Sequence, residues 1–408
     1  MNSVVVTGLG FVTSIGNDCG EVIASLREMR HGFERVEFVP GVVKVAGAVK
    51  DFDVSSENAV AWTWPARYSL PREFVRSLPP HGVYAACALE QALAQSGRDG
   101  LGDGATGLHC ASAGSPRMLR HHLNRMADSG WQRGHPLGVV SSVAGALNFN
   151  LAAYHGIRGA NCGFVSACSS GSHALGCAFD EIATGRQERM LVVAAEDLNA
   201  ESLLPFAAMG ALSECADPDC ASRPFDTARD GFVGAGGAAA IVLENAARAK
   251  RPLARMLGWA QASDGFHVAQ PEPSGAGIRA AMERALAAAG VGAGEIDHVN
   301  AHATSTPAGD RAEAIALRAV FLNHAPAVSS TKGLTGHGLS FSGVMEAAFC
   351  VLALAEQFVP GNANLNELDT ACDGLNLPRA SAPSRVRLAL NNSSGFGGSN
   401  VCHVFSTP

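Results

Sequence analysis

Strand-like and helix-like patterns alternate along this chain, and the alternation starts again near its middle. Regular alternation of this kind predicts an α/β fold, in which helices pack against a sheet. The restart after the basic, proline-containing stretch at 250–252 predicts two similar halves, residues 1–250 and 251–408, with sites at their junction. The expected strands and helices lie at 4–6, 19–29, 84–95, 108–111, 191–195, 278–289 and 297–300.

The glycines after the first strand do not form a dinucleotide-binding motif. Gly8 and Gly10 begin a G-x-G-x-x-G fingerprint, but Thr13 stands where the third glycine is required. We therefore expect only that the strand at 4–6 ends in a glycine turn. The proline-containing segment at 33–80 predicts a loop-rich excursion over the surface.

Composition argues against several classes of protein. The net charge is -7 and no Lys/Arg-rich block is present, so we expect no binding to nucleic acid. The eleven cysteines are irregularly spaced and form no zinc-type ligand set, which predicts reduced thiols in a cytoplasmic protein without a metal. The N-terminal apolar run is too short for a signal sequence or a membrane span, so we expect a soluble chain with no membrane insertion.

Cys168 is the first candidate for chemistry. It stands in VSACSSG, between a short apolar run and the first turn of a helix rich in small residues. The free N–H groups and the dipole at a helix N-terminus stabilise a thiolate, so the sequence predicts a Cys168 pKa below its ordinary value. Ser169, Ser170 and Gly171 leave room for an acyl group at the sulfur.

Three further motifs lie in the second half. His302, in NAHATSTP, is expected where a strand ends, which is where open α/β sheets carry their sites. Lys332 and His337 fall in a glycine-rich loop, TKGLTGHG, and Phe396 falls in a glycine turn, GFGGSN, between two strands. A single loop histidine is usually structural, so these motifs indicate chemistry only as a set.

In this order, SACSSG, HATSTPAGD, TKGLTGH and GFGGSN resemble the β-ketoacyl-acyl-carrier-protein synthases, nearest to elongating types I and II. The resemblance runs from TGLGFVTSIG to the C-terminus. It implies a thiolase-like fold, with two similar βαβαβ-type halves in a five-layer αβαβα arrangement. It also implies an acyltransferase that condenses an acyl-enzyme thioester with malonyl carrier protein, losing carbon dioxide, in fatty acid or polyketide/polyene biosynthesis.

The resemblance implies partners but no resident cofactor. The phosphopantetheine arm arrives on an acyl carrier protein. A second identical subunit, or a ketosynthase-like chain-length subunit, completes a dimer through the Cys-bearing half. Because carrier proteins of this pathway type are acidic, a basic docking patch is expected despite the negative net charge. Five arginines are its candidates: Arg72, Arg76, Arg120, Arg125 and Arg133.

The resemblance also implies roles for the reacting groups. Cys168 attacks the acyl thioester, and the backbone N–H groups of Cys168 and Phe396 receive the oxyanion. His302 and His337 both donate to the malonyl thioester oxygen and stabilise the enolate. Lys332, paired with Glu346, tunes the site electrostatically rather than acting as a nucleophile.

The remaining predicted site residues surround that centre. Thr304 and Thr306 match hydroxyls that hold the phosphopantetheine, Phe396 matches an aromatic gate, and Phe232 is expected at the same mouth. Asp310 is expected to support the site. Three positions depart from the family pattern: Ala303 replaces a glycine, Ser394 an aromatic residue and Glu73 a basic one. The first two put the acyl class and chain length in doubt.

Other thiolase-fold functions stay open as alternatives. A chain-length subunit or a non-elongating acyltransferase of the same fold is the main one, although Cys168 and both histidines argue against a non-catalytic subunit. A non-decarboxylating thiolase needs a second reactive cysteine, whereas Cys402 lies in a strand pattern. Initiating synthases use a Cys-His-Asn set that Asn392 and Asn400 do not reproduce.

Overall fold

The main element of the fold is one mixed sheet of ten strands. The computed structural model describes residues 1–36, 38 and 41–408. The first half contributes β1 (Val4–Val12), β4 (Thr106–Ala111), β5 (Asn161–Phe164), β6 (Arg189–Glu196) and β7 (Gly237–Asn245). The second half contributes β8 (Ala254–Ser263), β9 (His298–Asn300), β10 (Ala327–Ser329), β13 (Leu388–Gly395) and β14 (Ser399–Ser406).

The same five-stranded pattern occurs twice. In the first half the order is β1-β7-β6-β4-β5, with two antiparallel pairings followed by two parallel ones. In the second half the order β8-β14-β13-β9-β10 repeats that series of pairings. The prediction of an α/β fold with two similar halves is therefore confirmed. The exact boundary at 250 stays a prediction.

The two five-stranded groups are joined at one corner. Residues Val4–Val6 of β1 pair antiparallel with residues Ala254–Met256 of β8, so the backbone hydrogen bonds continue from one group into the other. The short pairing makes one ten-stranded sheet where two separate sheets were expected.

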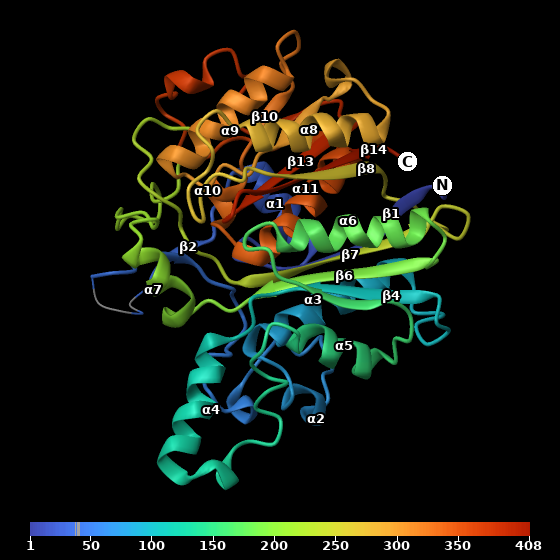
Figure 1. Cartoon of the computed structure of the whole chain (residues 1–408), viewed down its shortest axis with the longest axis vertical. Helices are drawn as coiled ribbons and strands as arrows, with labels where there is room; N and C mark the ends of the chain where they lie inside the picture. The colour runs from blue at the N-terminus through green and yellow to red at the C-terminus, as the bar shows by residue number, and fades with distance from the viewer. Residues whose placement is uncertain (37, 39–40) are drawn as a thin grey trace.

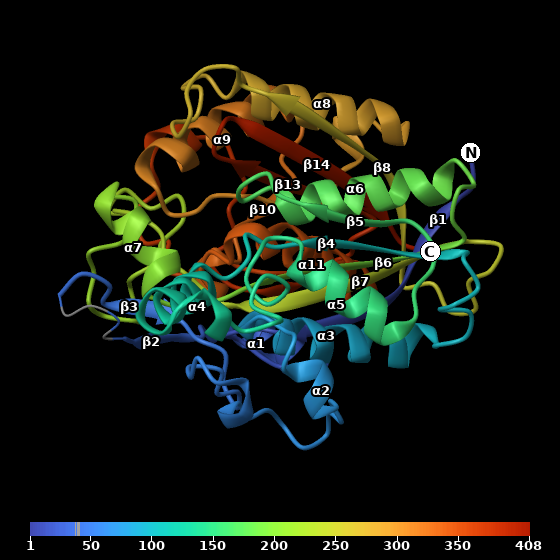
Figure 2. The same ribbon diagram turned by 60° about the horizontal axis from the view of Figure 1, so that its bottom comes forward.

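Helices separate and cover the two groups of strands (Figure 1). One outer helix, α3 (Pro80–Ser96), packs on β1, β7 and β6, and α8 (Ala276–Ala289) packs on β8 and β14 from the opposite side. Between the groups lie α6 (Ser170–Ala183) and α11 (Ser342–Glu356), which contact each other and strands of both halves. The result is the expected five-layer order, which Figure 2 shows from a second direction.

Shorter elements occupy the loops. The excursion at 33–80 is loop-rich as expected, and its described residues also include two short strands and two short helices. The remaining elements are α1 (Cys19–Glu28), β2 (Phe33–Arg35), β3 (Val45–Gly47), η1 (Ala59–Ala61), α2 (Arg72–Val75), α4 (Pro116–Ser129), η2 (Trp131–Arg133), α5 (Ala146–His155), α7 (Ala200–Ala208), η3 (Ala293–Glu295), α9 (Pro307–Val320), α10 (Lys332–Thr335), η4 (Leu339–Phe341), β11 (Phe358–Val359), η5 (Thr370–Cys372) and β12 (Ala382–Pro383).

The glycines after Val6 do not end the first strand, and that prediction is wrong. β1 continues through them to Val12, with one irregularity in register between Val6 and Gly8. A Cβ at Gly8 would lie 2.3 Å from Ala92 O, and one at Gly10 would lie 1.8 Å from Ala88 O. These glycines therefore let the backbone of α3 approach the strand closely.

Helix α11 is long and strongly apolar, and it belongs to the core. The span Leu339–Glu356 is long and apolar enough to cross a membrane, but 83% of it is buried inside the structure. Its side chains join the main hydrophobic cluster through residues such as Val344, Phe349 and Val351. The helix is therefore the central layer of the fold rather than a membrane span.

Helices α6 and α11 cross at a contact made of small residues. A Cβ at Gly171 would lie 2.9 Å from Ser340 O, and one at Gly343 would lie 2.2 Å from Ser172 Oγ and 2.7 Å from its backbone N. Side chains larger than hydrogen at these two positions would push the helices apart. The N-terminus of α6 would move with them.

We predict that Gly343→Ala destabilises the protein by about 1–3 kcal/mol, because the added methyl overpacks a buried contact. Gly294→Ala is the matched control, since a Cβ there meets no atom within 4 Å. The free energy of unfolding in denaturant measures both variants. Equal stabilities for the two would contradict the close crossing of α6 and α11.

Candidate active site

Cys168 lies in the turn that connects β5 to α6. The residue before it, Ala167, has a φ of 52°, an uncommon left-handed conformation for a residue with a side chain. That turn places the thiol at the start of the helix, with the side chain largely buried at 9% exposure. The sequence prediction of a cysteine just before a helix is confirmed.

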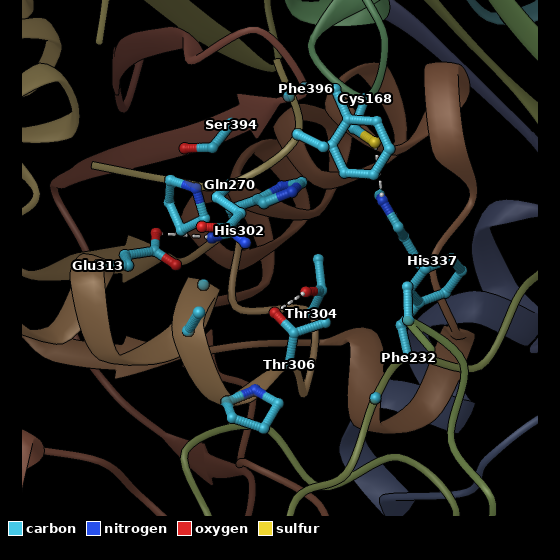
Figure 3. A pocket seen from close by; sticks show the side chains of 18 of the residues that line it. Cys168, Phe232, Gln270, His302, Thr304, Thr306, Glu313, His337, Ser394 and Phe396 are labelled. Carbon is cyan, nitrogen blue, oxygen red and sulfur yellow. Dashed lines mark hydrogen bonds between the residues drawn. The ribbon is translucent and has the colours of Figure 1, made fainter. Parts of the chain in front are cut away.

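His337 lies beside the thiol. Its Nε2 is 3.0 Å from Cys168 Sγ (Figure 3). Its Nδ1 is 3.1 Å from Ser342 Oγ. Ser342 Oγ already accepts a hydrogen bond from the backbone N–H of Gly338, so its own proton is free to point at Nδ1. This arrangement favours the neutral tautomer whose proton is on Nε2, facing the sulfur.

His302 and His337 form a pair of imidazoles from different loops. Their ring centroids are 5.3 Å apart and nearly perpendicular. Lys332 Nζ lies 3.4 Å from His302 Nδ1 and donates to His302 O at 2.5 Å. Since an ammonium only donates, Nδ1 of His302 must accept and its proton belongs on Nε2. Both imidazoles therefore carry a proton on Nε2, and each could donate a hydrogen bond to a substrate oxygen.

Lys332 is completely buried and paired. Its Nζ is 2.5 Å from Glu346 Oε1, and both side chains are at most 1% exposed. The predicted Lys332–Glu346 pair is thus present. Burial of a charged pair is costly unless both charges are hydrogen-bonded. The Lys332 ammonium contacts Glu346 Oε1 and the His302 carbonyl, whereas Glu346 Oε2 has no hydrogen-bond partner among the described residues.

Glu313, on α9, is the residue that sequence analysis missed. Its carboxylate accepts hydrogen bonds from His302 N at 2.8 Å, Ala303 N at 2.6 Å and Asn392 Nδ2 at 2.6 Å. It therefore fixes the backbone that carries His302 at the end of β9. The sequence carried one signal for this role. Glu313 is an acidic residue one helix turn beyond Asp310, on the helix that follows the HATSTP motif.

Burial sets the charge state of the reacting groups. It raises the pKa of Cys168 to about 12, although the nearby Lys332 works in the opposite direction. The prediction of a lowered thiol pKa is therefore wrong, because loss of solvent outweighs the helix N-terminus. Burial, followed by the charge of Lys332, lowers the pKa of His302 and of His337 well below the usual value. At neutral pH the centre holds a thiol and two neutral imidazoles.

A pocket of about 560 Å³ opens in front of these groups. Cys168, His302 and His337 lie in its wall, as Figure 3 shows. The predicted residues Thr304 and Thr306 line it too, with their hydroxyl oxygens 3.0 Å apart. The pocket is large enough for an extended arm that brings a thioester to the sulfur.

Aromatic rings form one side of the mouth. Phe232 stands edge-on to His337 at 5.2 Å, and Phe206 contacts both Phe232 at 5.3 Å and Phe396 at 5.9 Å. Phe396 is 38% exposed, so its ring is not locked in the core. The preceding Gly395 lies close to the thiol-bearing turn, because a Cβ there would be only 3.1 Å from Cys168 N.

Some predicted residues lie apart from the reacting groups. Asp310 accepts from Phe225 N at 2.9 Å and lies 3.7 Å from Arg229, so it braces the 223–231 loop and makes no hydrogen bond to Cys168, His302 or His337. Both asparagines of the alternative Cys-His-Asn set are engaged elsewhere: Asn392 with Glu313 and Asn400 with Asp264.

The structure also locates Cys402 and two residues that depart from the family pattern, Ala303 and Ser394. Cys402 is buried in β14, with its sulfur 3.0 Å from Asn392 Oδ1. Ala303 is buried and held by Glu313, while Ser394 lines the pocket. No group of three or more His, Cys, Asp or Glu side chains is arranged to hold a metal ion within the residues that the structure describes.

A duplicated five-layer α/β fold with a cysteine at a helix start and two histidines facing it defines a condensing enzyme of thiolase-like fold. Residues 1–249 match the model of the N-terminal domain of β-ketoacyl synthases, and residues 253–366 match that of the C-terminal domain. The chain belongs to the β-ketoacyl synthase family. The predicted thiolase-like fold is confirmed.

Known proteins agree over the whole length. The 3-oxoacyl-[acyl-carrier-protein] synthase 1 of Escherichia coli (strain K12) is 34% identical, covering 99% of this chain and 98% of that protein. A β-ketoacyl synthase structure from Burkholderia phymatum STM815 has a TM-score of 0.91 at 31% identity, and the match covers 100% of both chains. The ishigamide ketosynthase/chain length factor structure has a TM-score of 0.88 at 27% identity, covering 100% and 99%.

This chain is therefore an acyltransferase, a β-ketoacyl-acyl-carrier-protein synthase of fatty acid or polyketide biosynthesis. The predicted reaction class is confirmed. The roles of the individual residues follow from their geometry and are proposed below.

We predict that Glu313→Gln lowers the condensation rate by about 10²-fold, because the amide cannot accept all three hydrogen bonds and His302 moves from its place. Self-acylation of Cys168 should stay within about twofold of wild type. Both steps are measured by mass spectrometry of the enzyme and its product.

Glu283→Gln, on the exposed face of α8, is the control with the same chemical change. Equal losses in self-acylation and condensation for Glu313→Gln would indicate general misfolding. That result would refute a positioning role toward His302.

Proposed function

We propose that Cys168 is the nucleophile and that His302 and His337 activate the second substrate of a decarboxylative condensation. The observation that carries this proposal is the contact of His337 Nε2 with Cys168 Sγ at 3.0 Å, with the His302 ring beside it. Two neutral imidazoles beside one buried thiol suit a reaction whose intermediates carry negative charge on a thioester oxygen.

In the first step, acyl transfer, Cys168 attacks the carbonyl of an acyl thioester. The sulfur forms the new thioester bond, the bond to the departing arm breaks, and the thiol proton ends on the departing sulfur. The backbone N–H groups of Cys168 and Phe396 are the proposed oxyanion donors, and the close approach of Gly395 to Cys168 N supports their shared position. Because burial raises the thiol pKa, stabilisation of the oxyanion matters more than a preformed thiolate.

In the second step, a malonyl thioester loses carbon dioxide, and the electron pair of the broken C–C bond forms an enolate. The Nε2–H groups of His302 and His337 donate to the enolate oxygen. Its carbon then attacks the acyl group on Cys168, the C–S bond breaks, and the departing Cys168 thiolate takes up one proton from solvent to restore the thiol. Lys332 acts only as a positioning residue, since its charge lies against Glu346 and the far side of His302.

The chain itself supplies the nucleophile and the donors for both steps, so we propose that it needs no resident cofactor or metal. The phosphopantetheine stays with the carrier protein. We place the enzyme in the cytoplasm, in line with its eleven free cysteines.

Replacing Cys168 separates the two steps. We predict that Cys168→Ala abolishes the acyl-enzyme, while Cys168→Gln continues to decarboxylate malonyl carrier without condensation, because the amide resembles an acylated thiol. Intact-protein mass spectrometry and carbon dioxide release measure these outcomes. His302→Ala and His337→Ala should each lower condensation by about 10²–10³-fold while retaining part of the self-acylation.

Cys19→Ala, at a partly exposed cysteine at the start of α1, is the control and should behave as wild type. Condensation at the normal rate in Cys168→Ala would disprove the nucleophile. Normal condensation in both histidine variants would disprove their role at the enolate.

We propose an acyl carrier protein as the substrate-bearing partner, supported by the name of the Escherichia coli relative. The five candidate arginines are exposed, Arg72 and Arg76 at α2 and the others on α4 and η2. The loop that contains Val54 and Val60 connects the two groups of arginines. Arg72 at α2 donates to Val60 O, and Arg117 of α4 donates to Val54 O. Glu73, on α2, remains an acidic interruption.

Helix α4 also reaches the pocket mouth through α7. Arg120 of α4 forms an ion pair with Glu201 of α7, and Phe206 at the other end of α7 lines the pocket. An acidic partner bound to α4 would therefore lie near the mouth.

We propose a dimer through the first half. β5 is an edge strand of the sheet, and residues 161–163 on it are exposed. Unpaired edges of this kind recruit another strand. Exposed Phe149, Tyr154 and Val165 lie on the neighbouring helix and turn. The ishigamide ketosynthase/chain length factor offers a precedent for an unlike partner, so both an identical and an unlike second subunit fit this edge.

We predict that the double variant Arg125→Glu/Arg133→Glu raises KM for malonyl carrier protein about tenfold at low salt, because reversed charge repels an acidic partner. The effect should shrink as ionic strength rises. Malonyl-pantetheine, which lacks the protein, should react at the wild-type rate. Steady-state kinetics at two salt concentrations measure these values.

Arg385→Glu is the control. It lies ahead of β13, at the end of that strand away from Gly395. An unchanged KM for malonyl carrier protein in the double variant would rule out docking at Arg125 and Arg133.

A further inference from the structure

A loop at 213–222 carries two cysteines next to the substrate pocket. It begins where Ser213 Oγ donates to Asp230 Oδ1 at 2.8 Å and Ser213 N donates to Phe232 O at 2.9 Å. It ends where Ser222 Oγ donates to Lys332 O at 2.8 Å. Both ends of the loop are therefore fixed to residues of the pocket wall or of the buried centre.

The two thiols of this loop are already in contact. Cys215 Sγ lies 2.9 Å from Cys220 Sγ, within one short segment, ECADPDC. A disulfide requires about 2.05 Å between the sulfurs, so less than about 1 Å of approach separates the thiol pair from the bonded form. The backbone N–H of Cys215 is held by Ser213 Oγ, and that of Cys220 by Asp217 O, which keeps the two side chains facing each other.

The pair is accessible to small reagents. Both cysteines are partly exposed, in contrast to the largely buried Cys168. Their side of the loop is open because Glu214, Asp217 and Asp219 point to solvent, while Cys215 packs against a small cluster with Phe33 and Val233. A dissolved oxidant can reach the sulfurs without entering the active site.

We propose that Cys215 and Cys220 form a reversible redox-modification site, a dithiol that a peroxide converts to an intraloop disulfide. One thiol attacks the peroxide, breaks the O–O bond and becomes a sulfenic acid, releasing water. The second thiol attacks that sulfur, the S–O bond breaks and a second water leaves. Two thiols and one hydrogen peroxide thus give one disulfide and two waters, and a dithiol reductant reverses the change.

The disulfide would link two segments that are anchored close to the substrate pocket. The disulfide would close a covalent ring between the segment anchored at Asp230 and Phe232 and the segment anchored at Lys332 O. Asp230 and Phe232 line the pocket at Cys168, and Lys332 lies in the buried centre beside His302. This site goes beyond the condensation reaction, which uses neither sulfur.

The test is mass spectrometry of the intact wild-type chain treated with increasing hydrogen peroxide, then iodoacetamide and trypsin. Residues 190–229 form one tryptic peptide, because trypsin does not cleave the Arg223–Pro224 bond, and this peptide contains these two cysteines and no other. We expect the peptide to lose both alkyl labels together and to become two hydrogens lighter. Dithiothreitol should restore both labels, and the change should occur at lower peroxide than oxidation of Cys19, which is partly exposed like the pair and is the only cysteine of tryptic peptide 1–27.

Single variants provide the matched comparison. In Cys215→Ser and in Cys220→Ser the remaining thiol should stay labelled, or become a sulfenic acid, under the conditions that oxidise the wild-type pair. The proposal is overturned if the wild-type peptide keeps both labels after Cys19 has been half oxidised. It is also overturned if the two labels disappear independently. Neither result depends on the folding of a variant, since both are read on the wild-type chain.

Discussion

The close crossing of α6 and α11 is the contact on which the rest of the structure depends. These helices fill the middle layer, and each contacts strands of both halves. Gly171 and Gly343 remove the side chains that would keep them apart. Since Cys168 precedes α6, and Lys332 and His337 precede α11, the distance between the helices also sets the distance between the nucleophile and its partners. The packing of these two helices therefore also fixes the geometry of the site.

A second constraint is electrostatic. The dry interior holds Lys332 against Glu346 and leaves the reacting thiol and imidazoles neutral. A neutral resting site avoids the cost of burying more charge. In the proposed mechanism, fixed N–H donors act only when an oxyanion or an enolate forms, which is when their stabilisation lowers the barrier.

Local patterns in the sequence predicted much of the fold and most of the site. Helices at 19–29 and 84–95 and the strand at 191–195 were found because their apolar periodicity is strong. The first strand was cut short, because Gly8 and Gly10 look like a turn until α3 lies against them. Glu313 was missed because its role comes from three backbone and side-chain donors brought together only by folding. The thiol pKa was wrong because the depth of burial is a tertiary property.

The repeated strand order relates the two sides of the site to each other. β5 and α6 of the first half correspond to β10 and α11 of the second, so the turn with Cys168 and the segment with Lys332 and His337 occupy equivalent positions in the two halves. The first connection spans residues 165–169, and the second spans residues 330–341. Cys168 and His337 therefore reach one pocket from the same position in two similar halves, with different chemistry on each side.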